Sequence, residues 1–105
     1  MLFKIAVYTS GRKLTALIDS GASRCYIAPK TIAAYELHLE KEKLHLELAD
    51  GSKVQSTHKA PNVTIVVGKT VCKVDFTVTQ LLFGVDLVLG MNWLALWNPV
   101  VDWKF

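Results

Sequence analysis

The sequence predicts an all-β domain with one short helix near its C-terminus. Apolar and polar residues alternate in short runs along most of the 105 residues, as they do in strands that bury one face. Turn-forming residues separate these runs at 9–12, 50–52 and 68–69. Residues 91–97, directly before Asn98-Pro99, favour a short helix instead. We find no linker, repeat or low-complexity tract, so we expect residues 1–105 to form a single domain.

The first half of the chain predicts a hairpin, a short strand and a brief helix. Phe3, Ile5 and Val7 alternate with more polar residues up to the turn at 9–12. The return strand, 14–18, is apolar on both faces, which indicates burial near the centre of a sheet. Residues 25–28 read as a short strand. Pro29 has the backbone angle favoured at a first helical position, and 31–37 can then form a brief helix.

The second half predicts two hairpins, a buried strand and the C-terminal helix. Residues 44–49 alternate strictly and resume through Val54, with Asp50-Gly51 at the tip between them. A second hairpin pairs 63–67 with 71–78 around Gly68-Lys69. Residues 85–89 are expected to be a core strand that ends at Gly90, and 100–103 a terminal strand after the helix.

Composition and charge exclude several classes of function. The net charge of +3 is spread along the chain, so it indicates solvated surface and no binding of nucleic acid. No apolar segment reaches the length of a membrane span, and the N-terminus lacks the features of a signal peptide, so we expect a cytoplasmic protein. Cys25 and Cys72 are expected to be free buried thiols. His38, His45 and His58 lack metal-ligand spacing, and we expect no metal and no cofactor.

Asp19-Ser20-Gly21-Ala22 is the candidate catalytic motif, because it places one carboxyl group at the end of a buried strand. The alternative is an ordinary turn without catalytic function, since Asp, Ser and Gly all favour turns. Hydrolysis of a peptide by carboxylates needs two of them facing one water. The motif occurs once, so a second copy of the chain would have to supply the other. Asp86 and Asp102 do not precede Ser/Thr-Gly, and we expect surface or capping roles for them.

Three features in order carry a family resemblance: the strand ending in Asp19-Ser20-Gly21-Ala22, the hairpin tip Asp50-Gly51-Ser52, and Leu87-Val88-Leu89-Gly90 before a helix. Together they resemble the retropepsins. The segment 84–94, followed by Asn98-Pro99 and Val101-Asp102-Trp103, looks like the protease of Ty3/Gypsy-type retrotransposons with long terminal repeats. The resemblance implies a closed β-barrel that is active as a symmetric homodimer, an aspartic endopeptidase that cuts a Gag-Pol polyprotein.

The resemblance also implies roles for individual residues. Asp19 would be the catalytic carboxylate, Ser20 would bond across the dimer axis, and Gly21 would let the backbone approach the substrate. The segment 88–90 would pack beneath this turn. Contacts to the substrate would come from the turn and from the hairpin that acts as a flap: Ala22, Ala49, Asp50, Gly51 and Ser52. Ser23 and Met91 stand where many retroviral members carry an acidic residue and an arginine, so a different network should support the site.

The partners expected from this resemblance are a second copy of the chain and an extended peptide or polyprotein, with no nucleic acid and no membrane. The setting would be the cytoplasm or a virus-like particle. Two alternatives stay open. One is a non-catalytic dimerisation or peptide-binding module of the same fold, and the other is a cytosolic host protease of this fold. The tail from Asn98 to Trp103 argues against the host protease.

Overall fold

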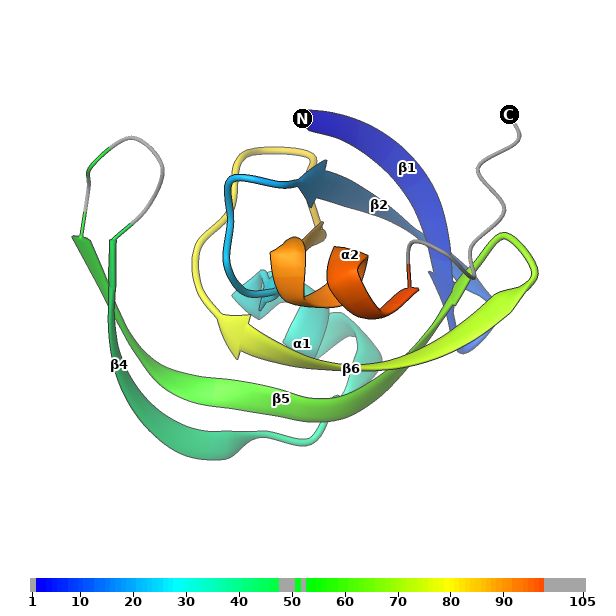
Figure 1. Ribbon diagram of the computed structural model, residues 1–105. Coiled ribbons are helices and arrows are strands. Elements are labelled where there is room, and N and C mark those ends of the chain that lie inside the picture. Colours follow the sequence, from blue (N-terminus) through cyan, green and yellow to red (C-terminus); the bar gives the residue numbers. More distant parts are fainter. Residues whose placement is uncertain (1, 48–50, 52, 98–105) are drawn as a thin grey trace.

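Six strands close into a barrel in a computed structural model that describes residues 2–47, 51 and 53–97 (Figure 1). The strands follow one another around the barrel in the order β1-β2-β7-β3-β6-β5. The pairing of Tyr8 in β1 with Val66 in β5 closes the ring. β4 lies outside the ring, on the edge of β5. Two short helices complete the described part, so the predicted closed β-barrel is confirmed.

β1 (Leu2–Thr9) and β2 (Arg12–Asp19) form the predicted hairpin, in register from Leu2↔Asp19 to Thr9↔Arg12. From Leu14 onward, side chains of β2 alternate between buried and partly buried, and β2 lies between β1 and β7 in the sheet. The prediction that residues 14–18 run near the centre of a sheet is therefore confirmed. Because β2 lies between β1 and β7, its last residue, Asp19, lies at the end of a central strand.

The short strand and the first helix follow, with boundaries that differ from the prediction. β3 covers Tyr26–Ile27, inside the expected 25–28. α1 covers Pro29–Tyr35 and not 31–37, because Pro29 already occupies the first turn and Glu36 takes a left-handed conformation with φ of 50°. The N–H groups of Glu36 and Leu37 then both reach the Ile32 carbonyl, which ends the helix.

The two predicted hairpins share one long strand. β4 (Glu40–Glu47) pairs with β5 (Lys53–Val67), and β5 pairs with β6 (Thr70–Val78). β4 begins four residues before the expected start at 44. β5 continues where the sequence predicted separate segments, because an irregularity between Ala60 and Val63 absorbs one extra residue. Asn62 lies at this bulge with a φ of 56°.

β7 (Leu87–Leu89) and α2 (Met91–Trp97) end the described part of the chain. β7 is shorter than the expected 85–89, because the Val85 N–H closes a turn onto the Leu82 carbonyl. The helix has the predicted bounds. The expected strand at 100–103, with Asp102, lies outside the described residues. Neither of the two described helices is long and apolar enough to cross a membrane.

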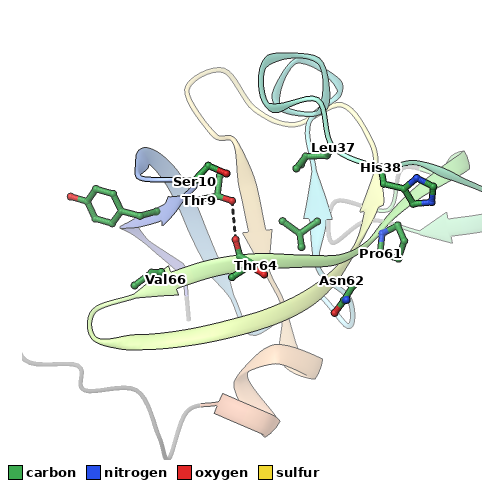
Figure 2. Close-up of a pocket in the computed structure, with 10 residues that line it drawn as sticks. Thr9, Ser10, Leu37, His38, Pro61, Asn62, Thr64 and Val66 are labelled. Carbon is green, nitrogen blue, oxygen red and sulfur yellow. Dashed lines mark hydrogen bonds between the residues drawn. The ribbon is translucent and has the colours of Figure 1, made fainter.

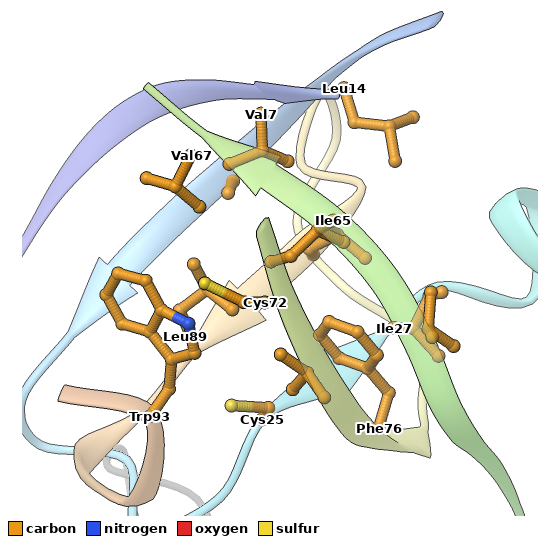
Figure 3. Packing of buried hydrophobic residues seen from close by; sticks show 14 of the residues in the cluster. Val7, Leu14, Cys25, Ile27, Ile65, Val67, Cys72, Phe76, Leu89 and Trp93 are labelled. Atoms are coloured by element: carbon orange, nitrogen blue, oxygen red, sulfur yellow. The ribbon is translucent and has the colours of Figure 1, made fainter. Parts of the chain in front are cut away.

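One apolar cluster fills the barrel (Figure 3). Strand side chains such as Ile18, Ile65 and Leu89 are fully buried in it, and Trp93 projects into it from α2. Cys25 and Cys72 are both free and buried in this cluster, as predicted. Because the helix residue Trp93 packs into the barrel, α2 is held against the end of β7 that follows Leu89.

Candidate active site

Asp19 is the last residue of β2, and its carboxylate is held by the turn that follows. Its Oδ1 accepts a hydrogen bond from the Gly21 N–H at 2.9 Å, and its carbonyl oxygen accepts one from the Ala22 N–H at 3.2 Å. Asp19 and Ser20 are partly exposed. The structure therefore presents one carboxylate at the end of a central strand, with a defined orientation and access to solvent.

Gly21 leaves little space for a side chain beside this carboxylate. A Cβ atom added at Gly21 would lie 3.1 Å from Asp19 Oδ1, which is closer than nearly all real contacts of this kind. A side chain here would push against the carboxylate and disturb the bond from the Gly21 N–H. The role that the resemblance implies for Gly21, to let the backbone approach the substrate, remains a prediction.

Gly90 supports the turn from below. A Cβ atom at Gly90 would lie 2.6 Å from the Ala22 carbonyl oxygen and closer still to that of Arg24. The Met91 N–H also donates to the Ala22 carbonyl oxygen at 2.7 Å. The backbone before α2 therefore packs directly on residues 22–24, and the predicted packing of this apolar-apolar-Gly segment beneath the turn is confirmed at Gly90.

A different network replaces the acidic residue and the arginine that many retroviral members carry. The side chains of Ser23 and Met91 are exposed, and Met91 contacts the turn through its backbone. Cys25 Sγ donates to Asn92 Oδ1 at 3.2 Å, which links the chain after the turn to α2. The sequence reasoning missed Asn92. Its position at the start of a helix, where Asn often bonds backbone N–H groups, was the available signal.

Asp86 lies outside the site and fastens the barrel. Its Oδ2 accepts the Thr15 N–H at 2.9 Å, and its own N–H donates to the Thr15 carbonyl oxygen at 2.9 Å. Its carbonyl oxygen accepts the Ala28 N–H at 3.1 Å. Asp86 was expected at the surface or as a cap, whereas these bonds of a partly buried residue join β2, the chain before β7, and the start of α1.

The expected flap corresponds to the hairpin of β4 and β5, which extends away from the barrel in Figure 1. Pairing continues as far as Glu47↔Lys53. Gly51, between these strands, has a φ of 85°, a conformation that favours glycine. Of the other residues expected to contact substrate here, Ala49, Asp50 and Ser52 lie outside the described residues.

The sequence analysis did not predict an exposed apolar turn that lies near the candidate site. Leu81 and Ala22 pack against the same small cluster of Tyr26, Val85 and Val88, which places the turn after β6 next to the Asp19 turn. Leu82 is 74% exposed and Phe83 is 101% exposed. The available signal was the run Leu81-Leu82-Phe83 between two predicted strands. Large apolar residues in a loop are not explained by a place in the core, so they indicate a contact surface.

The candidate site offers carboxylate chemistry and no group of metal ligands. Among the residues whose placement is described, no three His, Cys, Asp or Glu side chains come together in a way that could hold a metal ion. Asp19 is the acidic group of the turn 19–22. An arrangement of this kind can orient a water or bind a peptide group, and a second carboxylate would complete it.

The chain is similar in sequence to two viral enzymatic polyproteins. In an alignment of 107 positions, the chain is 26% identical to the enzymatic polyprotein of cauliflower mosaic virus (strain BBC). The alignment covers 92% of this chain and 16% of the polyprotein. It is 24% identical to the enzymatic polyprotein of carnation etched ring virus over 102 residues, which cover 97% of this chain and 15% of that protein. The chain thus spans about a sixth of the length of these relatives.

Solved structures support the same fold. The barrel superposes on the EIAV protease complexed with the inhibitor HBY-793 with a TM-score of 0.72 and 16% identity, covering 100% of this chain and 94% of that one. It superposes on the retroviral protease-like domain of Ddi1 from Leishmania major with a TM-score of 0.65 and 13% identity, covering 93% and 76%. The family described as the PEG10/RTL1 protease domain matches residues 15–105. Because this match spans most of its length, the chain belongs to the PEG10/RTL1 protease domain family, with the fold of the retroviral proteases.

Proposed function

We propose that this chain is an aspartic endopeptidase in which Asp19 supplies one of two catalytic carboxylates. The observation that carries the proposal is the position of Asp19 at the end of β2, where its Oδ1 accepts the Gly21 N–H at 2.9 Å. The close packing of Gly90 on residues 22–24 restrains the same turn. A carboxylate on a rigid support keeps its orientation when substrate binds, which favours catalysis.

The second carboxylate would be Asp19 of another copy. The chain carries the Asp-Ser-Gly motif once, and a two-fold axis brings the same residue of each copy together. One carboxylate takes a proton from a water that attacks the peptide carbonyl carbon, while the other, protonated, donates to the carbonyl oxygen. The pair shares one proton, because two adjacent ionised carboxylates repel each other. Ser20 would brace the two turns across the axis.

The substrate we propose is an extended segment of a polyprotein. The relatives named enzymatic polyproteins support this choice, as does family membership. Within that class, we propose the Gag-Pol polyprotein of a Ty3/Gypsy-type retrotransposon, processed in cytoplasmic virus-like particles, with residues 1–105 acting as one protease domain. The hairpin of β4 and β5 would cover the peptide, and Leu82 and Phe83 would offer apolar contacts to its side chains.

Replacement of Asp19 by Asn tests the catalytic assignment. The amide keeps the shape of the side chain and one oxygen acceptor, so the fold should remain while cleavage of a mixed peptide library falls by at least about a thousandfold. Asp75→Asn makes the same chemical change at an exposed carboxylate on β6 and should leave cleavage unchanged. Mass spectrometry of the peptides measures cleavage by each variant, and a thermal unfolding curve shows whether each variant is folded. Normal turnover by the folded Asp19→Asn variant would refute the proposal.

A further inference from the structure

A recess with a volume of about 460 Å³ lies against β5, and no residue of the turn 19–22 lines it. It is bounded by β5, by the end of β1 with the turn after it, and by the loop that follows α1 (Figure 2). Its volume falls within the range of roughly 300–1,000 Å³ that is usual for sites of small molecules. Neither the proposed chemistry at Asp19 nor the expected flap tip accounts for this recess.

The recess occupies a gap beside β5. β1 reaches β5 at Tyr8↔Val66, and β4 reaches it as far as Glu40↔Lys59. Between these points β6 covers one edge of residues 60–65, and the described pairings place no strand on the other edge. The ring of strands is therefore closed at one end of this stretch and flanked by β4 at the other, with the recess between them.

The backbone in this gap is poorly suited to an added strand. Pro61 has no N–H to donate, and the N–H of Asn62 is directed to Asp75 Oδ1 at 2.7 Å. The carbonyl oxygen of Thr64 already accepts the Thr9 hydroxyl at 2.8 Å, as Figure 2 shows. A strand laid along β5 would find few partners for its own backbone. A compact ligand needs no such ladder of hydrogen bonds.

The lining indicates the chemistry of this ligand. Leu37, Val63 and Val66 supply apolar surface, while Ser10, Asn62 and His38 supply hydroxyl, amide and imidazole groups. None of the ten lining residues is Lys, Arg, Asp or Glu, and the imidazole of His38 already faces the Glu40 carboxylate at 3.6 Å, so a charged ligand would gain little from the lining. We infer that the recess binds an uncharged molecule with an apolar ring or branched body and one amide or hydroxyl group.

The recess lies next to the base of the β4–β5 hairpin, and this location couples the two. β4 begins at Glu40, two residues after the lining residue His38, and the bulge at Asn62 lies in β5 itself. Glu40 Oε1 also lies 3.7 Å from Lys59 Nζ, across the base of the hairpin. A molecule in the recess contacts the chain at the base of both strands and restrains their angle to the barrel. The consequence for substrate access rests on the proposed function, whereas binding itself does not.

Three probes of nearly equal shape test the inference: naphthamide, naphthoate and naphthamidine, which are neutral, anionic and cationic. Methyl NMR of the full chain, carried out on the Asp19→Asn variant, should show shifts of the Leu37, Val63 and Val66 methyl groups on addition of naphthamide. The neutral probe should bind about tenfold more tightly than either charged probe. Equal affinity for all three, shifts confined to the Asp19 turn, or no shifts would overturn the inference.

A charge introduced into the recess should reverse this preference. Val66→Lys should weaken naphthamide and strengthen naphthoate, while Leu96→Lys provides the control. Leu96 is 73% exposed on α2 and does not line the recess. If Val66→Lys does not fold, Thr64→Lys, at an exposed position of the lining, gives the same test. An identical response to Val66→Lys, or to Thr64→Lys in its place, and to Leu96→Lys would exclude this recess as the site.

Amide hydrogen exchange of the Asp19→Asn variant separates the effect on the hairpin from catalysis. Saturating naphthamide should slow exchange in β4 and in residues 53–60 of β5, and Val66→Lys should abolish this protection. Binding without protection would refute the restraint of the hairpin. If protection occurs and wild-type protein cleaves no peptide, the proposed function fails and the ligand site stands.

Discussion

Gly90 illustrates how one missing side chain supports the candidate site. The backbone at Gly90 approaches residues 22–24 so closely that a Cβ atom would lie 2.2 Å from the Arg24 carbonyl oxygen. The atoms in the way belong to the backbone and cannot rotate aside. The turn that holds the Asp19 carboxylate therefore depends on Gly90, which directly follows β7 and is far from Asp19 in the sequence.

Gly90→Ala should lower the free energy of unfolding by at least about 2 kcal/mol, because the barrel must shift to accommodate one methyl group. Gly11→Ala is the control. Gly11 has a φ of 75° but no atom within 4 Å of the added Cβ, so only the left-handed backbone is penalised, by about 1 kcal/mol. Urea denaturation of both variants measures the difference. A smaller loss for Gly90→Ala than for Gly11→Ala would contradict the packing.

Cys25 should make stability depend on pH. Burial raises the pKa of its thiol from 9.0 to about 11, against smaller opposite effects of hydrogen bonds from the Gly90 and Trp93 backbone. Between pH 9 and 11 the folded protein therefore keeps a proton that the unfolded chain releases. Stability is full below pH 9 and should fall by about 2 kcal/mol as the pH rises to 11. Urea denaturation at several pH values should show a shallower decline for Cys25→Ala, and parallel curves would contradict the assignment.

The chain before β7 shows how a short element is fixed by its neighbours. β7 covers Leu87–Leu89 and pairs in parallel with β2 over Ala16↔Leu87 to Ile18↔Leu89. The hydrogen bonds between Asp86 and Thr15 extend this contact by one residue on each strand. A strand of this length has little stability of its own, and the side chain of Asp86 compensates by bonding the backbone of β2.

Asp86→Ala should lower the free energy of unfolding by about 1–3 kcal/mol, because the partly buried Thr15 N–H loses its acceptor. Asp86→Asn should cost less, since its amide oxygen can still accept that bond. The pair with Lys30 at 3.9 Å adds little, because the Lys30 side chain is 61% exposed. Equal losses for the two variants in urea denaturation would show that charge, and not the hydrogen bond, matters at this position.

The complete enzyme that we propose contains two copies of the chain, and mixing experiments can count the required carboxylates. Equal amounts of wild type and Asp19→Asn, allowed to exchange subunits, should retain about one quarter of the wild-type activity, because only dimers with two intact copies are competent. A protein active as a monomer would retain about half. Sedimentation across a concentration range, with activity measured on the same samples, should show turnover that follows the dimer fraction.

Local patterns in the sequence predicted most of the elements and the candidate carboxylate. Alternation of apolar and polar residues predicted β1 and the hairpins, since a strand with one buried face has a period of two, and the apolar stretch 14–18 predicted β2. Asn98-Pro99 marked the end of α2, because proline disfavours helical angles in the residue before it. The buried strand before Asp19 and the turn formers after it pointed to the motif. The roles of Asp19, Ser20 and Gly21 in catalysis remain predictions.

What only the tertiary structure decided depends on contacts between distant segments. The bulge at Asn62, which turns two expected segments into the single strand β5, is bonded to Asp75 on the neighbouring strand. The recess beside β5 exists because β1 and β4 cover different parts of one edge. Gly90 and Asn92 meet the chain after Asp19 only once the barrel closes. Local preferences act over a few residues, whereas these features follow from how whole strands pair and pack. The local pattern therefore contained no signal for the bulge or the recess, and the packing of Gly90 was expected only through the family resemblance.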